Sequence, residues 1–394
     1  MNRFQSYLHR AVSLVEAYHG DPPLAAYLKE YFSRNRQHGS RDRRIISQFC
    51  YGAFRLGPMG KDLPPDERLL AGYWLSRNEP GEVLAALRPD WNELAGLPAS
   101  AKLDRLSLDP AGIFPWTAEL SRGVDPSRFS LSHLQQPALF LRIRPGQGAV
   151  VRAKLEAANQ PYKACGPDCL QLENSSPVDR ILDLDREAVV QDLSSQLVAG
   201  LYAGLQLAGS QAAGPCSVWD CCAASGGKSL QAWDLLGPVQ LTVSDIRESI
   251  LSNLARRFAA AGIRNYRRLQ ADLTRPGPQR LPSGQDLILA DVPCTGSGTW
   301  GRTPERLGFF DPGSLDLYAG RQRDIAGLAA SRLRPGGYLV YSTCSVFRQE
   351  NEEVVTWLAE QASLERVRED LFPGYERRAD TMYAALLRRP SLSQ

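Results

Sequence analysis

The second half of the chain predicts an α/β fold with a mostly parallel sheet. From Ser217 onward, short apolar runs alternate with longer segments of helical periodicity. Strands that alternate with crossover helices form a parallel sheet covered by helices on both faces. Upstream the sequence changes character twice, so we expect a small α+β subdomain before this sheet and a helical domain before that.

Composition sets the broad class of the protein. The chain has 394 residues, which is enough for two or three domains that each bury a core. The hydrophobic share of 43% and the charged share of 23% are typical of soluble globular proteins, and no apolar run approaches the length of a membrane span. The start lacks the apolar core of a signal peptide, so we expect a cytoplasmic protein without membrane contact.

Cysteine and histidine usage exclude several classes of site. Eight cysteines are too few for a disulfide scaffold, and the adjacent pair Cys221-Cys222 suits free thiols in a reducing compartment. The close pair Cys165 and Cys169 has no second pair or histidine nearby, so we expect no metal. All four histidines lie in the first third of the chain, which argues against a cysteine protease with a histidine base.

Charge gives a weaker signal about partners. The net charge of +3 is too small to indicate a nucleic-acid partner by itself. Basic residues nevertheless cluster in two places, at Arg34, Arg36, Arg41, Arg43 and Arg44, and at Arg256, Arg257, Arg264, Arg267 and Arg268. Such clusters are usually solvated faces, and contact with RNA is the alternative.

The expected organisation is a helical domain at residues 1–130, a small α+β subdomain at 131–190 and an α/β domain at 191–394. In the subdomain we expect a strand at Ala138–Arg144, a helix at Val150–Ala158 and a strand at Cys169–Leu172. A helix from about Ser194 to Ala208 leads into the last domain. Its expected strands are Ser217–Cys221, Gln240–Ser244, Tyr266–Gln270, Asp286–Asp291, Tyr338–Thr343 and Met382–Leu387, and its main helices are Ile246–Ala261, Ser314–Leu333 and Glu350–Gln361.

The ends of the first three of these strands favour a cofactor that contains adenosine. After the first, a turn with Gly226 and Gly227 opens a helix, where the backbone can approach a ligand and offers free amide donors. Asp245 follows about twenty residues later, where doubly wound folds hold ribose hydroxyls. Asp272 ends the third strand and would accept from an adenine amine or cap a turn. No Walker motif is present, whereas a dinucleotide remains an alternative.

Two later strands each end in a cysteine. The apolar run from Asp286 reaches Asp291, and Pro293 then stops strand pairing and places Cys294 on the loop beyond. The run from Gly336 in the same way leads to Cys344. Because ligands of open α/β sheets bind beyond the carboxyl ends of the strands, both thiols are expected beside the cofactor. A single cysteine at such a place is more often an inert buried thiol.

With both cysteines in their motifs, the sequence resembles the RsmB/NOP/Sun family of S-adenosylmethionine-dependent RNA cytosine 5-methyltransferases. The matching residues are Cys222-Ala223-Ala224-Ser225-Gly226-Gly227-Lys228, Asp245, Asp272, Asp291 to Gly298, Arg302-Thr303-Pro304, and Ser342-Thr343-Cys344-Ser345 followed by Glu350-Asn351-Glu352. The resemblance implies a Rossmann-like class I methyltransferase domain, S-adenosyl-L-methionine as cofactor and RNA as partner. Ribosomal RNA is the expected substrate, and transfer RNA is the alternative.

The upstream resemblance is weaker. Gln191–Gln196 resembles the link into the catalytic domain, Leu141-Arg142 the RRM-like subdomain, and the helical start a NusB-like RNA-binding domain. Two residues depart from the family pattern. Ser225 stands where proline is usual, and Arg144 stands where asparagine is usual.

The resemblance also implies roles for the site residues. Carbon 5 of cytosine is too weak a nucleophile to accept a methyl group directly, and thiolate addition at carbon 6 activates it. By resemblance Cys344 is this nucleophile, Asp291 holds the base and Cys294 assists release. The cofactor would be held by Cys222, Ala223, Ala224, Ser225, Gly226, Gly227, Lys228, Asp245, Asp272 and Asp291.

Three other functions were weighed. A DNA cytosine methyltransferase would use the thiol that follows proline, and the second cysteine argues against it. A non-catalytic RNA-binding or assembly factor could retain the fold, but the intact site residues argue against that. An NAD-linked oxidoreductase rests only on the glycine turn and Asp245. Nothing in the sequence requires a protein partner or more than a monomer.

Overall fold

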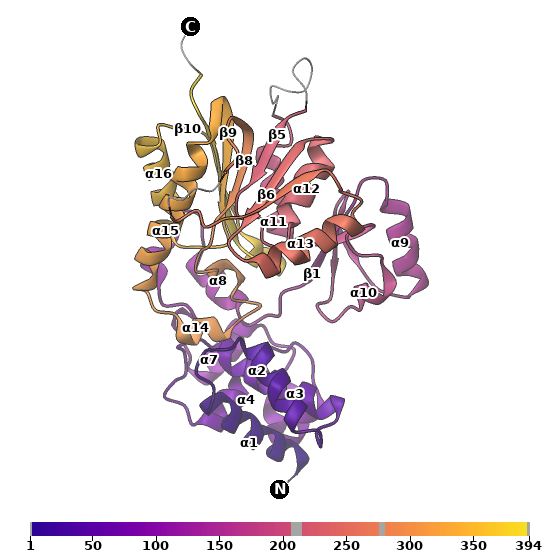
Figure 1. The fold of residues 1–394 in the computed structure, drawn as a ribbon. Coiled ribbons are helices and arrows are strands. Elements are labelled where there is room, and N and C mark those ends of the chain that lie inside the picture. The colour runs from indigo at the N-terminus through magenta and orange to yellow at the C-terminus, as the bar shows by residue number, and fades with distance from the viewer. Residues whose placement is uncertain (1, 206–214, 276–279, 392–394) are drawn as a thin grey trace. The chain divides into compact units, whose positions relative to one another are not determined.

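The computed structural model describes residues 2–205, 215–275 and 280–391. The chain divides into two compact units, each assembled from stretches distant in sequence (Figure 1). The helical unit comprises Met1–Leu120, Val124–Pro137 and Thr299–Pro312, and the sheet unit comprises Ser121–Gly123, Ala138–Gly298 and Gly313–Gln394. The expected domain boundaries at residues 130 and 190 remain a prediction.

The helical unit confirms the expected helical start of the chain. Its α-helices among the described residues are α1 (Arg3–Glu16), α2 (Leu24–Arg34), α3 (Ser40–Arg55), α4 (Pro65–Leu75), α5 (Glu82–Leu87), α6 (Pro89–Glu93), α7 (Ala99–Leu106), α8 (Pro126–Ser132) and α14 (Glu305–Phe309). Helices α3 and α4 meet at Gly52 and Gly72. A Cβ on Gly72 would lie 2.2 Å from the carbonyl oxygen of Gly52, so only glycine fits at this crossing.

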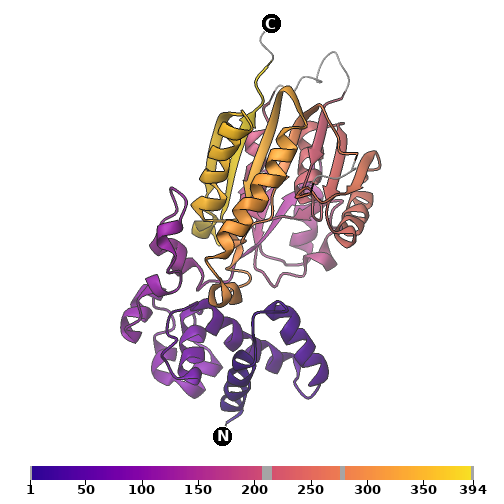
Figure 2. The same ribbon diagram turned by 60° about the vertical axis from the view of Figure 1, so that its left-hand side comes forward.

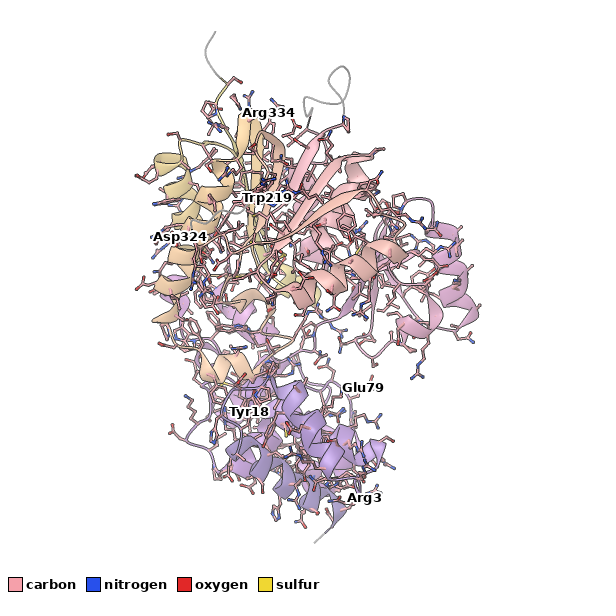
Figure 3. The ribbon with its side chains drawn as sticks, in the orientation of Figure 1. Arg3, Tyr18, Glu79, Trp219, Asp324 and Arg334 are labelled. Atoms are coloured by element: carbon pink, nitrogen blue, oxygen red, sulfur yellow. The ribbon has the colours of Figure 1, made fainter. Side chains whose placement is uncertain are left out.

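Residues 299–312 pack into the helical unit although both flanking stretches belong to the sheet unit. The buried guanidinium of Arg55 donates to the carbonyl oxygen of Gly301 at 3.1 Å. The ring of Phe309 packs edge-on against Tyr18, with centroids 5.6 Å apart; Figure 3 labels Tyr18. The matched motif Arg302–Pro304 therefore lies in the helical unit.

The smaller sheet of the sheet unit is antiparallel, with strand order β2-β3-β1-β4. Its elements are β1 (Leu139–Ile143), α9 (Gly148–Ala157), β2 (Lys163–Gly166), β3 (Cys169–Leu172), α10 (Val178–Ile181) and β4 (Ala188–Val190). The core between the sheet and α9 contains Leu141, Val151, Leu155 and Leu170. The two expected strands and the helix are present, whereas β2 and β4 were not expected.

The larger sheet has seven strands in the order β10-β11-β9-β8-β5-β6-β7. Its strands are β5 (Ser217–Asp220), β6 (Gln240–Asp245), β7 (Tyr266–Gln270), β8 (Gln285–Asp291), β9 (Leu333–Thr343), β10 (Glu365–Phe372) and β11 (Met382–Arg388). Neighbours from β9 through β7 pair in parallel, and β10 and β11 pair antiparallel. The predicted α/β fold with a mostly parallel sheet is confirmed.

Helices cover both faces of this sheet. Trp219 on β5, labelled in Figure 3, packs in the layer under α15 (Ser314–Ala330) and α16 (Glu352–Gln361), which Figure 2 shows along one face. Its neighbour Val218 packs in the opposite layer, under α12 (Gly227–Leu236) and α13 (Glu248–Ala260). Successive side chains of a strand point to opposite faces, so one strand supplies both cores.

Two expectations about this unit were wrong in detail. The helix expected from Ser194 to Ala208 is a short helix α11 (Leu193–Leu197) followed by a 3₁₀ turn at Val198–Leu201, and residues 206–208 lie outside the described residues. Strand β10 was missed because its first five residues are exposed and mostly charged. Charged residues are common on edge strands, where they discourage pairing with other chains, and they hide the apolar alternation.

Arg144, one of the two departures from the family pattern, is partly buried and forms an ion pair. From just beyond β1 it reaches Asp234 on α12 at 2.7 Å, and Arg142 on β1 reaches the same carboxylate at 2.6 Å. The Arg144 guanidinium also donates to the carbonyl oxygen of Ala261 at 2.7 Å. Arg144 therefore ties the smaller sheet to the helices of the larger one.

Within the described ranges, no helix is long and apolar enough to cross a membrane. Those ranges also hold no group of three or more histidine, cysteine or acidic side chains placed to bind a metal ion.

Candidate active site

The turn between β5 and α12 takes its shape from two residues in left-handed conformation. Ala224 has φ of 45° and Gly226 has φ of 85°. A Cβ on Gly226 would lie 2.8 Å from the ring of Phe258 and 3.0 Å from Leu254. Glycine is therefore required at this position by both conformation and space.

Ser225, the second departure from the family pattern, is held by an arginine. Arg257 on α13 donates to the carbonyl oxygen of Ser225 at 2.8 Å and to its hydroxyl at 3.0 Å. The same guanidinium pairs with Asp185 at 2.7 Å. A proline at position 225 would lack the hydroxyl that accepts this hydrogen bond from Arg257.

Asp245 ends β6 and is almost fully buried. Its carboxylate accepts from the backbone amide of Ala224 at 3.1 Å and from that of Arg247 at 2.9 Å. Asp245 therefore fixes the Gly-rich turn from the neighbouring strand. Its expected role toward a ribose remains a prediction.

Asp272 follows β7 and forms a turn with its own neighbours. Its carboxylate accepts from the Thr274 amide at 3.0 Å and from the Thr274 hydroxyl at 2.6 Å. These two hydrogen bonds lower the pKa of Asp272. Turn capping, one of the two expected roles, is thus present, and the adenine contact remains a prediction.

Asp291, at the end of β8, is held on both oxygens. Lys228 Nζ lies 2.8 Å from Oδ2, and the Ser342 hydroxyl donates to Oδ1 at 2.9 Å. Lys228 also donates to the hydroxyl of Ser195 at 3.3 Å. The ammonium and the carboxylate form an oriented pair whose acid is still about a third exposed, with 34% side-chain accessibility.

The two cysteines are in contact. The Sγ atoms of Cys294 and Cys344 lie 3.4 Å apart, and both thiols are partly buried. The hydrogen bond with Cys344 raises the pKa of Cys294 well above its usual value, and burial and the nearby charges of Cys344 and Glu350 add to this. The pKa of Cys294 therefore depends on its contact with Cys344.

A cavity of about 300 Å³ connects most of these residues. It is lined by Val190, Gln191, Asp192, Ser195, Asp220, Cys222, Ala223, Ala224, Ser225, Gly227, Lys228, Arg257, Asp291, Cys344, Asp380 and Met382. Of the expected site residues, Gly226, Asp245, Asp272 and Cys294 do not line it. Cys344 thus lines the same cavity as the Gly-rich turn. Cys294 lies behind it, in contact with the Cys344 thiol.

Sequence reasoning missed several lining residues. Asp220, at the end of β5, is fully enclosed, and burial raises its pKa to about 7. Its Oδ2 accepts from the Ser229 hydroxyl at 2.5 Å, and its Oδ1 has no hydrogen-bond partner among the described residues. An acid that ends the first strand of such a sheet was the available signal.

Asp380 and Met382 were missed for a topological reason. Strand β11 runs antiparallel to β9, so Tyr383 pairs with Thr343. The beginning of β11, rather than its end, therefore meets the edge that carries the site. If β11 is taken as parallel to β9, these residues are placed at the opposite edge of the sheet.

Comparisons with known proteins match the part of the chain that contains most of this site. Residues 212–385 match the family model described as 16S rRNA methyltransferase RsmB/F. The ribosomal RNA small subunit methyltransferase F of Escherichia fergusonii is 35% identical over 193 residues, which is 48% of this chain and 39% of that protein. The chain therefore spans less than half the length of this relative.

Solved structures share the fold. The crystal structure of PH0851 covers 98% of this chain and 98% of its own, with a TM-score of 0.66 at 17% identity. The crystal structure of NSun6 from Pyrococcus horikoshii with SFG covers 67% of this chain and 95% of its own, with a TM-score of 0.55 at 14% identity.

Proposed function

We propose, because residues 212–385 match the family model described as 16S rRNA methyltransferase RsmB/F, that this chain methylates carbon 5 of a cytosine in RNA, with ribosomal RNA as the substrate. The observation that carries this proposal is the placement of Cys344. Its thiol lines the same cavity as the Gly-rich turn and Asp291, and a second thiol lies 3.4 Å from it. The proposed nucleophile, the acid proposed to bind the base and the turn proposed to bind the cofactor therefore line one cavity.

The residues present fit S-adenosyl-L-methionine as the cofactor. The buried Oδ1 of Asp220 lacks a partner in the described part of the chain and belongs to the cavity lining, where it suits a cationic donor such as an ammonium group. Gly227 lines the same cavity, and a Cβ on it would meet nothing within 4 Å, so its backbone is open to a ligand. When bound, the cofactor supplies a methyl group on a positively charged sulfur.

Cys344 acts as the nucleophile in this proposal. Its thiolate forms a bond to carbon 6 of the cytosine, and the electron pair of the 5,6 double bond moves to carbon 5, which takes the methyl group. Asp291 accepts from the exocyclic amine of the base while Lys228 holds the carboxylate at 2.8 Å. Fixed polar groups of this kind stabilise charge that develops during the addition.

Cys294 assists release. The proton on carbon 5 leaves to Cys294 or to a base that acts through it, the double bond re-forms, and the bond between Cys344 and carbon 6 breaks. The raised pKa of Cys294 keeps it protonated while Cys344 attacks, so the two thiols do not compete. Once the Cys344 sulfur is bonded to carbon, it no longer holds Cys294 in a thiol–thiol hydrogen bond, so Cys294 can give its own proton to solvent and then accept the proton of carbon 5 as a thiolate.

The test is replacement of the nucleophile. Cys344→Ser should abolish methyl transfer to RNA while leaving S-adenosylmethionine binding at its parent level, measured with a labelled methyl group and by calorimetry. Cys165→Ser, in the smaller sheet, is the matched control and should keep full activity. Unchanged turnover of the Cys344→Ser protein would overturn the assignment.

The substrate RNA needs its own experiment. Bisulfite sequencing of total RNA from cells with and without the gene should locate the methylated cytosine in ribosomal RNA. A missing mark in transfer RNA instead would assign the chain to that substrate and refute the ribosomal one.

A further inference from the structure

Glu350 is a fully buried acid beside the two cysteines. It lies just beyond the Cys344 loop and has 0% exposure. Its carboxylate lines no part of the cavity described above, so it has no direct contact with a substrate there. Its position behind the reactive loops calls for another role.

Four donors surround the carboxylate. Oε1 accepts from the backbone amide of Thr295 at 2.8 Å and from the side-chain amide of Gln322 at 3.0 Å. Oε2 accepts from the hydroxyl of Thr295 at 2.6 Å and from the hydroxyl of Ser345. A carboxylate has about four acceptor sites, and donors fill all of them here, which favours the charged form although burial raises the pKa of Glu350.

The donors come from both cysteine loops. Thr295 directly follows Cys294, and Ser345 directly follows Cys344. Gln322 on α15 extends the network, because its side-chain amide also donates to the carbonyl oxygen of Pro293 at 3.0 Å. One buried charge therefore fixes the chain on either side of Cys294 and immediately after Cys344.

We propose that Glu350 is a positioning residue that locks the two cysteine loops together and, through its buried negative charge, reserves the nucleophilic role for Cys344. This inference rests on the proposed function, in which the two thiols have different roles. Two of the four donors to Glu350 belong to Thr295, which directly follows Cys294, so the charge is held against the Cys294 loop, where a like charge opposes ionisation of the thiol. Cys294 then keeps its proton while Cys344 attacks, and it remains available for release.

Other titratable groups act on the same network. Tyr341 on β9 donates its hydroxyl to the carbonyl oxygen of Glu350 at 2.6 Å. Arg323 on α15 and Tyr383 on β11 interact electrostatically with Tyr341. Neither of these two residues hydrogen-bonds to the Glu350 carboxylate, whose partners are all neutral donors. Removal of the Glu350 charge is therefore the direct test.

Glu350→Gln removes the charge and keeps the shape. The glutamine oxygen can accept from the Thr295 amide and from Gln322, while its nitrogen donates to the two hydroxyls, which rotate to accept. The probe is iodoacetamide, applied between pH 6 and pH 10 to the full chain with S-adenosylmethionine and without RNA. Peptide mass spectrometry then gives the alkylated fraction of Cys294 and of Cys344 separately.

In the parent, Cys344 should be alkylated at lower pH than Cys294. In Glu350→Gln, the ratio of Cys294 to Cys344 alkylation at pH 8 should rise about tenfold, because loss of the nearby negative charge lowers the pKa of Cys294. Glu352→Gln is the matched control, because Glu352 binds Ser121 and the Arg122 amide instead of the cysteine loops, and it should keep the parent ratio. If Glu350→Gln keeps the parent ratio of Cys294 to Cys344 alkylation, or if alkylation rises equally at both thiols, the proposal is overturned.

A second variant covers the case in which Glu350→Gln fails to fold. Ser345→Ala removes the hydroxyl that hydrogen-bonds to Glu350, Thr295 and Ser297, and it leaves the charge of Glu350 in place. It should lower kcat about fivefold, the value of one hydrogen bond, with an unchanged KM for S-adenosylmethionine and an unchanged alkylation ratio. Parent kcat would contradict the locking role. Because alkylation needs neither RNA nor turnover, its result is independent of the test with Cys344→Ser.

Discussion

Replacing Gly226 by alanine adds a methyl group where the turn before α12 has no room. The new Cβ would lie 2.8 Å from the ring of Phe258 and 3.0 Å from Leu254, at a backbone φ of 85°. The left-handed conformation costs a residue with a side chain about 1–2 kcal/mol. Crowding in a packed core costs about 1–3 kcal/mol more. We therefore expect the sheet unit to lose about 2–5 kcal/mol of stability.

Urea denaturation followed by tryptophan fluorescence measures this loss, and Gly227→Ala is its control. A Cβ on Gly227 meets nothing within 4 Å, and alanine is favoured over glycine in a helix by about 0.5–1 kcal/mol. Because Gly227 lines the cavity, this control should keep its stability but bind S-adenosylmethionine more weakly. A parent-like urea midpoint for Gly226→Ala would refute the packing reasoning. A large loss of stability in Gly227→Ala would refute it as well.

Three further changes test other parts of the sheet unit. Asp234→Ala should cost about 3–5 kcal/mol and lower the Tm in a thermal melt, because it leaves the buried Arg142 and the partly buried Arg144 without their shared partner; a parent Tm would contradict the ion-pair role. Asp220 has its pKa raised to about 7 in the folded protein, so its contribution to stability is complete below its unfolded pKa near 4 and is lost as pH rises toward 7 and beyond. The Tm of the free protein should therefore fall between pH 5 and pH 8, and it should fall by more than the Tm of the Asp220→Asn variant. An equal fall in Tm for the two proteins would be evidence against this. Cys294→Ala should accumulate a covalent adduct with substrate RNA, visible as a slowed band on a denaturing gel, and absence of the band with an RNA that the parent methylates would contradict its role in release.

Much of the larger sheet could be predicted from sequence because its central strands are buried on both faces. Strands β5, β6 and β8 consist largely of buried residues, so apolar runs mark them directly. The turn at Gly226 and the acids Asp245 and Asp291 follow such runs, which places them at one edge of the sheet. The signal fails at β10, where an edge strand needs no apolar face.

The network behind the cysteines could not be predicted for a different reason. Glu350 lies on a 3₁₀ turn, and its partners Thr295 and Gln322 are 55 and 28 residues away in sequence. A buried acid satisfied by neutral donors leaves no pattern of charge or periodicity. The position of residues 299–312 in the helical unit is equally invisible, because a chain that crosses between units changes no local propensity.

The shared carboxylate of Asp234 also constrains how this sequence can change over evolutionary time. Two arginines depend on one acid, so a substitution at Asp234 alone leaves both without their shared partner, whereas loss of Arg144 alone leaves Asp234 paired with Arg142. In homologous chains, positions 142, 144 and 234 should vary as a group, and their covariation would appear as a contact between the small sheet and α12.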